Sequence, residues 1–505
     1  MAGSSAPREP FYRNLSRTFQ QISYDEFVQR VRRHRPSELL PAIAAAAIEM
    51  RDRELWMRSR VLVPWALGLA AKEAIVSGNE HRPGGVTRKD IVQICEAVAK
   101  IRDPLGTSAD TGSVASFMTR VSHEQFPFQM SPFEEIARTQ ALYVDALAAA
   151  PTKRLTPALL SSALGSDPTD FAGVGFLLAV GAQLNSGYFD LRWLEQPNFV
   201  EICEVLPAEL IRAVFKLEFA TTAQAVRERV GRVRPPGDLK RHEFNPLRSR
   251  PFVEMSDGRH LAPQPAYAFH KLEPNAVYYA VAPRLGPDFT NDLGITFETY
   301  IARQLDQLDD VAVVPEIEYE DGRRSVDWFL VFGEVVVFVE AKITRLTESA
   351  RLGTSTLGQD LDRTIGEAFE QIGRSLGLVQ AAHPAFSAIP SDRPHVGLVI
   401  TLEPYWMANS LQTRSLMTKP PPDIPTLVAS SRELEQWIAD HPTGGGQVLH
   451  EIAIDAERRT WNLGLALPPR PGDRAKNRLL QRAWDRLPWR DALEDRNLSS
   501  KDAGV

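Results

Sequence analysis

The stretch "SVDWFLVFGEVVVFVEAKI", residues 325–343, constrains the fold of this chain more than any other segment. Its interior consists almost wholly of β-branched, aromatic and other apolar residues, which favour strands. Only Gly333-Glu334 interrupts the run, and glycine at the first position of a two-residue loop is typical of a type II′ hairpin turn. The stretch therefore predicts a β-hairpin whose other charged residues stand near its two ends.

The hairpin loop fixes which residues face each other across the two strands. Phe332 faces Val335, and counting back along both strands places Asp327 directly opposite Glu340. Cross-strand partners on one face have Cβ atoms about 4.5–5.5 Å apart, so two carboxylates held there repel each other unless a cation lies between them. Lys342 comes two residues after Glu340 and therefore lies on the same face.

Such a pair of carboxylates has a chemical use. Together with a backbone carbonyl, for which Ala341 is the candidate, Asp327 and Glu340 form a set of hard oxygen ligands suited to Mg²⁺ or Mn²⁺. A bound dication polarises a phosphodiester and lowers the pKa of a bound water, and the Lys342 ammonium adds a compact positive charge for the transition state. The expected chemistry is metal-assisted phosphodiester hydrolysis.

The elements around the hairpin follow a recognisable order. An amphipathic helix is predicted over residues 292–308, with Glu298 beside its apolar face. The strand "VAVVPEIEY" and the turn "EDGR" lead into the hairpin, and then "RTIGEAFEQIGRSLGLVQAA" returns to a helical period before the strand "HVGLVITLEP". The predicted order is helix, three antiparallel strands, helix, strand.

The segment "VDWFLVFGEVVVFVEAK" resembles the Asp…Glu-x-Lys signature of the PD-(D/E)xK nuclease superfamily, which has the restriction-endonuclease-like fold, and the element order matches that family's core. The resemblance covers about residues 291–404, under a quarter of the chain. Val326 stands where the family often has proline, which affects the turn more than the metal. A looser similarity, that of the whole layout, is to nucleases from bacterial defence loci.

The resemblance implies a role for each matching residue. It makes Asp327 and Glu340 metal ligands and Lys342 the catalytic lysine. It also implies that Glu298 is the acid on the preceding helix and that Gln371, in "EAFEQIGRS", is a polar helical residue near the site. Each has a plainer interpretation: a solvent-exposed ion-pair cluster at the end of an edge strand, an acid at a helix start, and an exposed helical glutamine.

The rest of the chain suggests several domains. We predict a helical sensing, partner-binding or regulatory domain over residues 1–226, and then a basic linker and strand-rich lead-in, including "PFVEMSDGRHLAPQP" and "NAVYYAVAP", over 227–290. The nuclease domain follows over 291–470 and a helical tail over 471–505. The fold class is thus an all-α domain followed by an α/β domain with a mixed central sheet. Between positions 227 and 250, eight Lys and Arg stand against three acids, which fits either a solvated linker or a phosphate-binding segment.

Composition narrows the setting. The 505 residues are 43% hydrophobic and 24% charged, as in a soluble globular protein, and the net charge of −6 argues against non-specific coating of nucleic acid. Cys95 and Cys203 alone provide neither a disulfide framework nor a cysteine-rich zinc site, so a reducing cytoplasm is expected. The longest apolar run is too short for a membrane span, and no membrane partner is expected.

Three hypotheses for function follow. The first is a Mg²⁺-dependent endonuclease, acting on DNA as a defence or restriction-type effector, whose helical half binds a partner protein or a second copy of the chain. The second is a protein with a degenerate nuclease fold that binds nucleic acid without cutting it. The third is a helical interaction scaffold. Two mutually repelling carboxylates beside an intact lysine favour the first.

Overall fold

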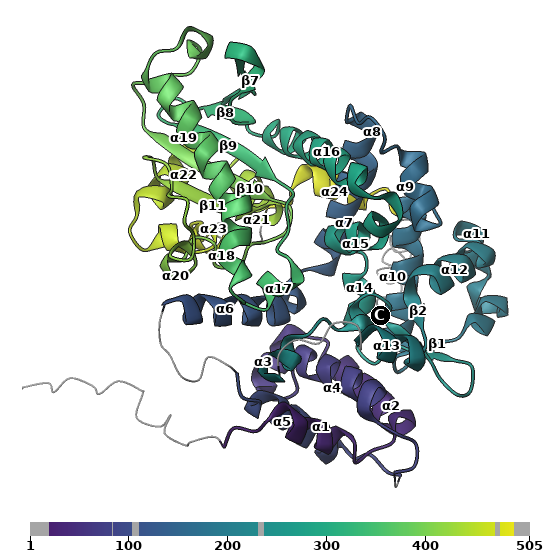
Figure 1. The fold of residues 1–505 in the computed structure, drawn as a ribbon. Coiled ribbons are helices and arrows are strands. Elements are labelled where there is room, and N and C mark those ends of the chain that lie inside the picture. Colours follow the sequence, from purple (N-terminus) through teal and green to yellow (C-terminus); the bar gives the residue numbers. More distant parts are fainter. Residues whose placement is uncertain (1–19, 83, 104–110, 231–236, 470–474, 489–505) are drawn as a thin grey trace, which may run out of the picture.

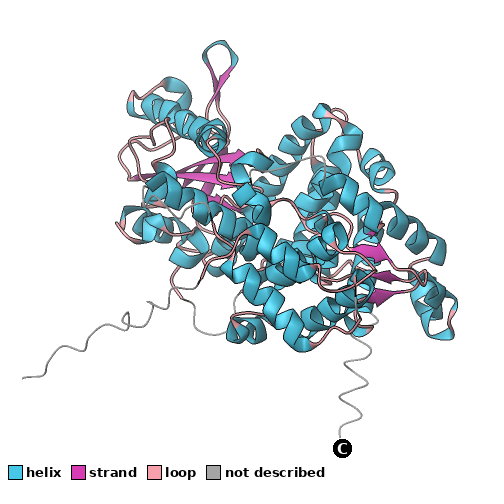
Figure 2. Cartoon of the chain, turned by 60° about the horizontal axis from the view of Figure 1, so that its bottom comes forward, coloured by secondary structure: helices cyan, strands magenta, loops and turns pink. Residues whose placement is uncertain are grey.

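The computed structural model describes residues 20–82, 84–103, 111–230, 237–469 and 475–488. Helices make up most of the chain, and the strands gather in two separate places (Figure 2). The first half forms a helical assembly, while the second half builds an α/β unit beside it (Figure 1). An α part followed by an α/β part with a mixed sheet was the predicted arrangement.

The first half is helical with two short exceptions. Its helices begin at residues that suit a helix start, as at Ser23 and Thr87, whose side chains form capping boxes with Glu26 and Asp90. The strands β1 (Tyr188–Phe189) and β2 (Ala220–Thr221) interrupt the pattern. The helices are α1 (Tyr24–Val31), α2 (Pro36–Glu49), α3 (Arg53–Ser59), α4 (Pro64–Ser77), α5 (Arg88–Lys100), α6 (Thr111–Gln125), α7 (Pro132–Gln140), α8 (Leu147–Ala149), α9 (Pro157–Leu164), α10 (Pro168–Leu184), α11 (Val200–Val205), α12 (Ala208–Val214) and α13 (Ala223–Val230).

The lead-in of residues 227–290 joins the first half and contains more helix than the sequence suggested. Its strands β3 (Phe252–Glu254) and β4 (His260–Leu261) complete a sheet of order β1-β4-β3-β2. Two helices follow, α14 (Ala266–His270) and α15 (Pro274–Leu285). The expectation of a strand at "NAVYYAVAP" was wrong, because a proline at the start suits a helix and Val277 and Val281, four residues apart, bury one face of α15.

The basic run that begins the lead-in makes contacts within the protein. The Arg227 side chain donates to the carbonyl of Ile75, and Arg241 pairs with Glu124 at 2.9 Å. Arg250 donates to the Ala220 carbonyl. Of the eight basic residues, Arg232 and Arg234 lie outside the described residues. Arg227, Arg241 and Arg250 therefore tie the lead-in to the helical half.

The α/β unit is built on a five-stranded sheet of order β11-β10-β9-β8-β5. Strand β8 is antiparallel to both β5 and β9, whereas β10 runs parallel to β9 and β11, so the sheet is mixed. A small hairpin of β6 (Glu318–Tyr319) and β7 (Arg323–Arg324) projects between β5 and β8, at the predicted "EDGR" turn. The five strands are β5 (Ala312–Pro315), β8 (Trp328–Val331), β9 (Val336–Lys342), β10 (His395–Thr401) and β11 (Thr426–Ser430).

The register of the β8–β9 hairpin is the predicted one, but the type II′ turn expected at Gly333-Glu334 is wrong, because Gly333 does not have the positive φ that this turn requires. Phe332 donates its N–H to the carbonyl of Val335, and Trp328 pairs with Val339. The rings of Phe329 and Phe338, paired across the strands, lie 5.0 Å apart at their centroids. Continuing this register by one residue places Asp327 opposite Glu340.

Helices cover both faces of this sheet. On one face lies α19 (Glu367–Gln380), preceded by α18 (Thr356–Leu361) (Figure 1). It packs on alternate strand residues such as Phe329 and Phe338. On the other lie α16 (Pro287–Leu305), α21 (Ser431–Asp440) and α22 (Gly445–Ile454). The predicted helix around Glu298 is α16, which begins five residues earlier than expected. Smaller helices are α17 (Glu348–Arg351), α20 (Leu411–Arg414) and α23 (Leu463–Ala466).

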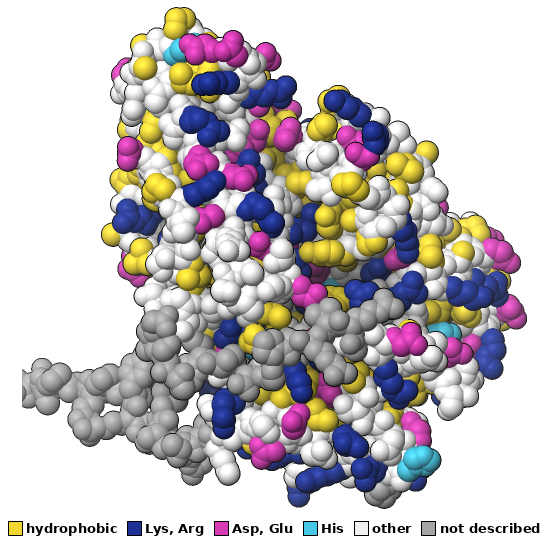
Figure 3. Space-filling model, viewed as in Figure 1, with side chains coloured by type: hydrophobic (Ala, Val, Ile, Leu, Met, Phe, Trp, Pro, Cys, Tyr) yellow, Lys and Arg dark blue, Asp and Glu magenta, His cyan; other side chains and the backbone are white. Residues whose placement is uncertain are grey.

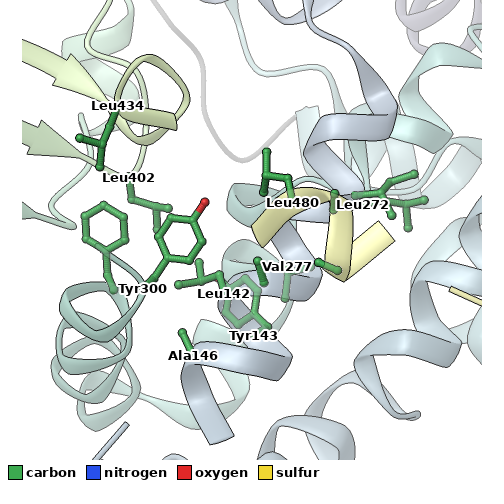
Figure 4. Packing of buried hydrophobic residues seen from close by; sticks show 14 of the residues in the cluster. Leu142, Tyr143, Ala146, Leu272, Val277, Tyr300, Leu402, Leu434 and Leu480 are labelled. Atoms are coloured by element: carbon green, nitrogen blue, oxygen red, sulfur yellow. The ribbon is translucent and has the colours of Figure 1, made fainter. Parts of the chain in front are cut away.

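One hydrophobic core runs through both halves. Leu142 and Tyr143, which lie between α7 and α8 in the helical half, pack in the same cluster as Tyr300 of α16 and Leu434 of α21 (Figure 4). Leu480 joins them from α24 (Arg478–Trp484), the described part of the predicted helical tail, while Trp489 and the residues after it lie outside the described residues.

A buried polar network crosses the same interface. Arg138 of α7 donates to both carboxylate oxygens of Glu435 on α21, at 2.7 and 2.5 Å, and also to Glu135. The Tyr300 hydroxyl donates to Glu435 as well, and Arg432 pairs with Glu135 at 2.8 Å. The two halves therefore share compensated charges as well as apolar surface.

Candidate functional site

The predicted site residues meet at the ends of β8 and β9. The Asp327 carboxylate accepts a hydrogen bond from the Ala341 backbone N–H at 2.7 Å. One residue before Ala341 on β9, Glu340 accepts a hydrogen bond from the Lys342 ammonium at 2.7 Å. The hairpin thus brings both acids, the lysine and the Ala341 backbone into one small volume.

Burial of this group argues against a surface ion-pair cluster at an edge strand. Strand β9 is the middle strand of five, and Glu340 is 2% exposed. Asp327 and Lys342 are half-buried. An exposed ion pair requires little desolvation, whereas a carboxylate at this depth loses most of its hydration and depends on its immediate partners.

Those partners do not balance the charge of the two acids. Burial raises the pKa of Glu340 to about 8, and the charge of Asp327 adds to this shift against the opposing effect of Lys342. Burial likewise raises the pKa of Asp327 to about 6, although the hydrogen bond from Ala341 and the charge of Lys342 act against it. One lysine is thus shared by two desolvated carboxyl groups, and both resist ionisation.

One oxygen of Glu340 has no hydrogen-bond partner among the described residues. Oε1 accepts from Lys342, while Oε2 is buried and unpaired. The Asp327 N–H lies near enough to favour the ionised carboxylate, but no hydrogen bond joins it to Oε2. A buried polar atom left without a partner costs about 1–3 kcal/mol, so a cation or a water at this point would be stabilising.

Glu298 lies within electrostatic reach of Asp327 and Lys342. Part of its side chain is exposed on α16, yet burial of the carboxyl raises its pKa to about 7, and the charges of Asp327 and Glu316 add to the rise. The charge of Asp327 thus raises the pKa of both Glu298 and Glu340. An ordinary acid at a helix start would not show this shift.

Gln371 supports the strand that carries Asp327. Its side-chain amide on α19 donates to the Ser325 carbonyl at 2.9 Å. One turn further along the helix, the Ser375 hydroxyl accepts a hydrogen bond from the Val326 N–H at 3.0 Å. These two bonds hold the residues just before Asp327, so Gln371 acts on the position of the acid through the backbone.

The sequence did not single out Glu316, a fourth acid near the site. The β5–β8 register, continued by one residue, places Glu316 opposite Asp327, and the charge of Glu316 raises the pKa of both Asp327 and Glu298. Its side chain pairs with Arg324 at 3.0 Å. The "PEIEY" segment was expected to form a strand. Its register relative to β8 could not be read from the sequence, because the β6–β7 hairpin is inserted between β5 and β8.

The donor set fits a hard dication held by few protein ligands. Among the residues that the structure describes, no group of three or more His, Cys, Asp and Glu side chains is placed to hold a metal ion. A dication here would rest on Asp327 and the unpaired oxygen of Glu340, with a backbone oxygen and waters completing its shell, as Mg²⁺ commonly does. The Ala341 carbonyl as that backbone ligand stays a prediction.

The rest of the surface gives few further indications. Lys and Arg side chains intermingle with Asp and Glu over the face shown in Figure 3. Within the described ranges, every helix is too short or too polar to serve as a membrane span.

Comparison with known proteins found no match of sufficient significance to a family model, to a curated protein or to a solved structure.

Proposed function

We propose that this chain is a metal-dependent nuclease that hydrolyses phosphodiester bonds, with DNA as the expected substrate. The observation that carries the proposal is the pair of desolvated carboxyl groups at Asp327 and Glu340, which share one lysine and leave one buried oxygen without a partner among the described residues. The resemblance of this segment to PD-(D/E)xK nucleases supports the same conclusion.

Each residue has a role in this proposal. Asp327 and Glu340 hold the dication, which when bound polarises the phosphodiester and lowers the pKa of an attacking water. The Lys342 ammonium stabilises negative charge that develops on the phosphate oxygens. Glu298, with its pKa near neutrality, is suited to accept a proton from water. Gln371 positions Asp327 through Ser325.

A role as a bacterial defence effector extends the proposal. The looser similarity of the whole layout to nucleases from defence loci supports it, and so does the close contact between the helical half and the α/β unit. Through Arg138 and Glu435, a change in the helical half reaches α21 and, at Tyr300, the helix that carries Glu298. In this view the helical half senses a partner and restrains or directs cutting.

One observation favours a second candidate, a protein that binds nucleic acid without cutting it. The Lys342 ammonium already lies 2.7 Å from Glu340 and neutralises part of the charge that a dication would balance. In a non-cleaving protein this ion pair replaces the metal permanently. The two candidates differ in whether a divalent cation displaces the lysine from Glu340.

The decisive experiment compares the wild type with Lys342→Ala. We expect the wild type to nick plasmid DNA with Mg²⁺ or Mn²⁺, and Lys342→Ala to lower the rate at least about 100-fold while Mn²⁺ binding survives, because both carboxylate ligands remain. Nicking is followed by gel electrophoresis, on single- and double-stranded DNA and RNA, and Mn²⁺ binding by calorimetry. Lys216→Ala, at an exposed lysine of the helical half, is the matched control and should keep full activity.

Asp327→Ala tests the ligand assignment. We expect it to weaken Mn²⁺ binding at least about tenfold, because it removes a direct carboxylate ligand. Unchanged Mn²⁺ affinity in Asp327→Ala would show that the metal binds elsewhere. Cleavage by Lys342→Ala at the wild-type rate would refute the catalytic role of Lys342. A wild type that neither binds Mn²⁺ nor cleaves any nucleic acid would refute the nuclease assignment and favour the second candidate.

A further inference from the structure

A cavity of about 150 Å³ lies inside the helical half, away from the β8–β9 hairpin. Its walls come from α2, α3, α4, α7, α10 and α14, together with the segment around residues 127–130. Arg51, which is exposed, also lines it, so the cavity meets solvent. An apolar cavity of about this volume accommodates a benzene-sized ring.

Aromatic side chains form much of the wall. Trp56, Phe128 and Phe269 line the cavity, and Trp56 is 3% exposed. Phe128 also contacts the His270 ring, with 4.9 Å between the ring centroids. Flat aromatic surfaces on several sides favour a planar occupant, because ring faces and edges pack well against one another.

The carboxyl group of Glu273 lines the cavity without a partner. Among the described residues, no hydrogen bond or ion pair to this carboxyl is found, and although Glu273 is the N-cap residue of α15, its side chain makes no capping hydrogen bond. Burial, followed by the charge of Glu135, raises the pKa of Glu273 to about 7, although Arg432 and Arg248 act to lower it. A partly buried carboxyl without a hydrogen bond is available to a ligand.

Glu135, the other acid that lines the cavity, is a carboxylate with a structural role. Glu135 also lines the wall, but Arg138 and Arg432 both pair with it. In the part of the chain that the structure describes, no such cation lies within hydrogen-bonding distance of Glu273. The charge pairs within the helical half therefore account for the buried carboxyl of Glu135, but not for that of Glu273.

His270 adds a second polar group without a partner. It lines the cavity, and its Nδ1 is buried with no hydrogen bond in the described part of the chain. Burial and the charges of Arg248 and Arg432 lower the pKa of His270 to about 3, so the ring is neutral and keeps one nitrogen as an acceptor. The polar side of the cavity thus offers acceptors beside aromatic walls.

We propose that this cavity is a binding site for a small planar organic molecule that presents paired N–H donors to Glu273, as an amidinium or an amino-substituted heterocycle does. Two parallel N–H bonds to one carboxylate are strong and specific in geometry. The aromatic walls would hold the flat part of the molecule. The nuclease proposal is not needed for this inference, because binding is measured directly.

The site would also be linked to the α/β unit. Glu135 lines the cavity and binds Arg138, which binds Glu435, which accepts a hydrogen bond from Tyr300 on α16. A molecule held beside Glu135 therefore contacts the first member of a continuous buried network that ends on the helix carrying Glu298.

Three probes of equal heavy-atom number and similar shape test the proposal: benzamidine, acetophenone and benzoate. Benzamidine offers paired N–H donors, acetophenone has none, and benzoate is an anion. Dissociation constants for the full chain are measured by ligand-observed NMR. We expect benzamidine to bind at least fivefold more tightly than acetophenone, and benzoate more weakly than either.

Two variants locate the binding. Glu273→Gln should reduce the preference for benzamidine over acetophenone to less than twofold while acetophenone binding is kept. Ala266→Leu, which adds a side chain at the cavity wall, should weaken both probes at least fivefold. Glu254→Gln, at an exposed glutamate on β3, is the control and should keep the wild-type preference.

Several results would overturn the proposal. These are the absence of benzamidine binding to the wild type, equal affinity for benzamidine and acetophenone, or a preference that survives Glu273→Gln. Unchanged binding in a folded Ala266→Leu protein would place the probes elsewhere. Thermal melting by circular dichroism checks each variant, and Glu273→Gln alone decides if Ala266→Leu does not fold.

Discussion

Two buried glutamates in this protein have opposite electrostatic surroundings. Glu135, in the network between the two halves, is 3% exposed, and Glu340, at the end of β9, is 2% exposed. Burial acts to raise the pKa of both. At Glu135 the charges and hydrogen bonds of Arg138 and Arg432 outweigh burial and lower the pKa, whereas at Glu340 the pKa rises to about 8.

The difference lies in the number and sign of the neighbours. Glu340 has one cation, Lys342, and a second carboxyl group, Asp327, on the opposite strand. Depth of burial alone therefore does not distinguish a structural carboxylate from a functional one. A buried carboxylate whose charge is fully compensated stabilises an interface, while one that is left under-compensated is typical of a site that takes up a charged ligand.

The largest expected effect on stability is at the compensated network. Arg138→Met leaves Glu135 and Glu435 buried with one arginine fewer between them, so we expect a loss of about 3–5 kcal/mol in the free energy of unfolding. Urea denaturation measures it. Arg154→Met is the control: it removes an arginine whose pair with Asp288 is exposed, and the expected loss is below about 1 kcal/mol. Similar losses in both variants would show that the network is not compensated as described.

The pH dependence of stability should separate the two glutamates. The pKa of Glu340 is raised on folding, so its contribution to stability is present at low pH and is lost as the pH rises through about 8. In metal-free buffer we expect the wild type to lose on the order of 3 kcal/mol relative to Glu340→Gln between pH 5 and pH 9. Melting curves in the presence of a chelator provide the measurement.

Glu135→Gln is the opposite case. The pKa of Glu135 is lowered on folding, so its stabilising contribution is present at neutral pH and is lost as the pH falls through its folded value. Glu135→Gln should therefore destabilise the protein at pH 7 and above, where Glu340→Gln stabilises it. The same sign of change for both variants at pH 9 would remove the distinction between the two regions.

The smallest expected effects come from two glutamines. Gln371→Ala removes one hydrogen bond to Ser325 and should cost about 1 kcal/mol, with a less than tenfold loss of nicking. Gln304→Ala, in the fully buried network, removes bonds to Tyr300 and Asn477 and should cost about 2–3 kcal/mol. Denaturation and the nicking assay measure both. If Gln371→Ala lost more stability than Gln304→Ala, Gln371 would be the more important of the two for folding, contrary to the role proposed for it.

The geometry of the candidate site followed from local sequence because it is set by a two-residue loop. Once Gly333 and Glu334 form the turn, the pairing of Phe332 with Val335 fixes every later pair, including Asp327 with Glu340. Apolar periodicity likewise placed Glu298 beside the buried face of α16. Short-range rules were sufficient in both cases, since each depends on neighbouring residues in the chain.

Other features depended on contacts that the local pattern does not contain. Residues 275–283 resemble a strand in composition, but the surrounding core buries one face of α15 as a helix. Glu316 faces Asp327 because the β6–β7 hairpin, inserted between β5 and β8, leaves these two strands free to pair. Propensity and alternation are weak where tertiary packing selects between helix and strand.

By itself the sequence determined a β-hairpin that forces two acids together beside a lysine, and a helical half followed by an α/β half. The tertiary structure alone decided how those acids are compensated. It placed β9 between β8 and β10, which buries Glu340, and it brought Arg138 to Glu435 across 297 positions of the chain. Hydrogen-bond register is a local property, whereas desolvation and the choice of a distant counter-ion arise only when the whole chain packs.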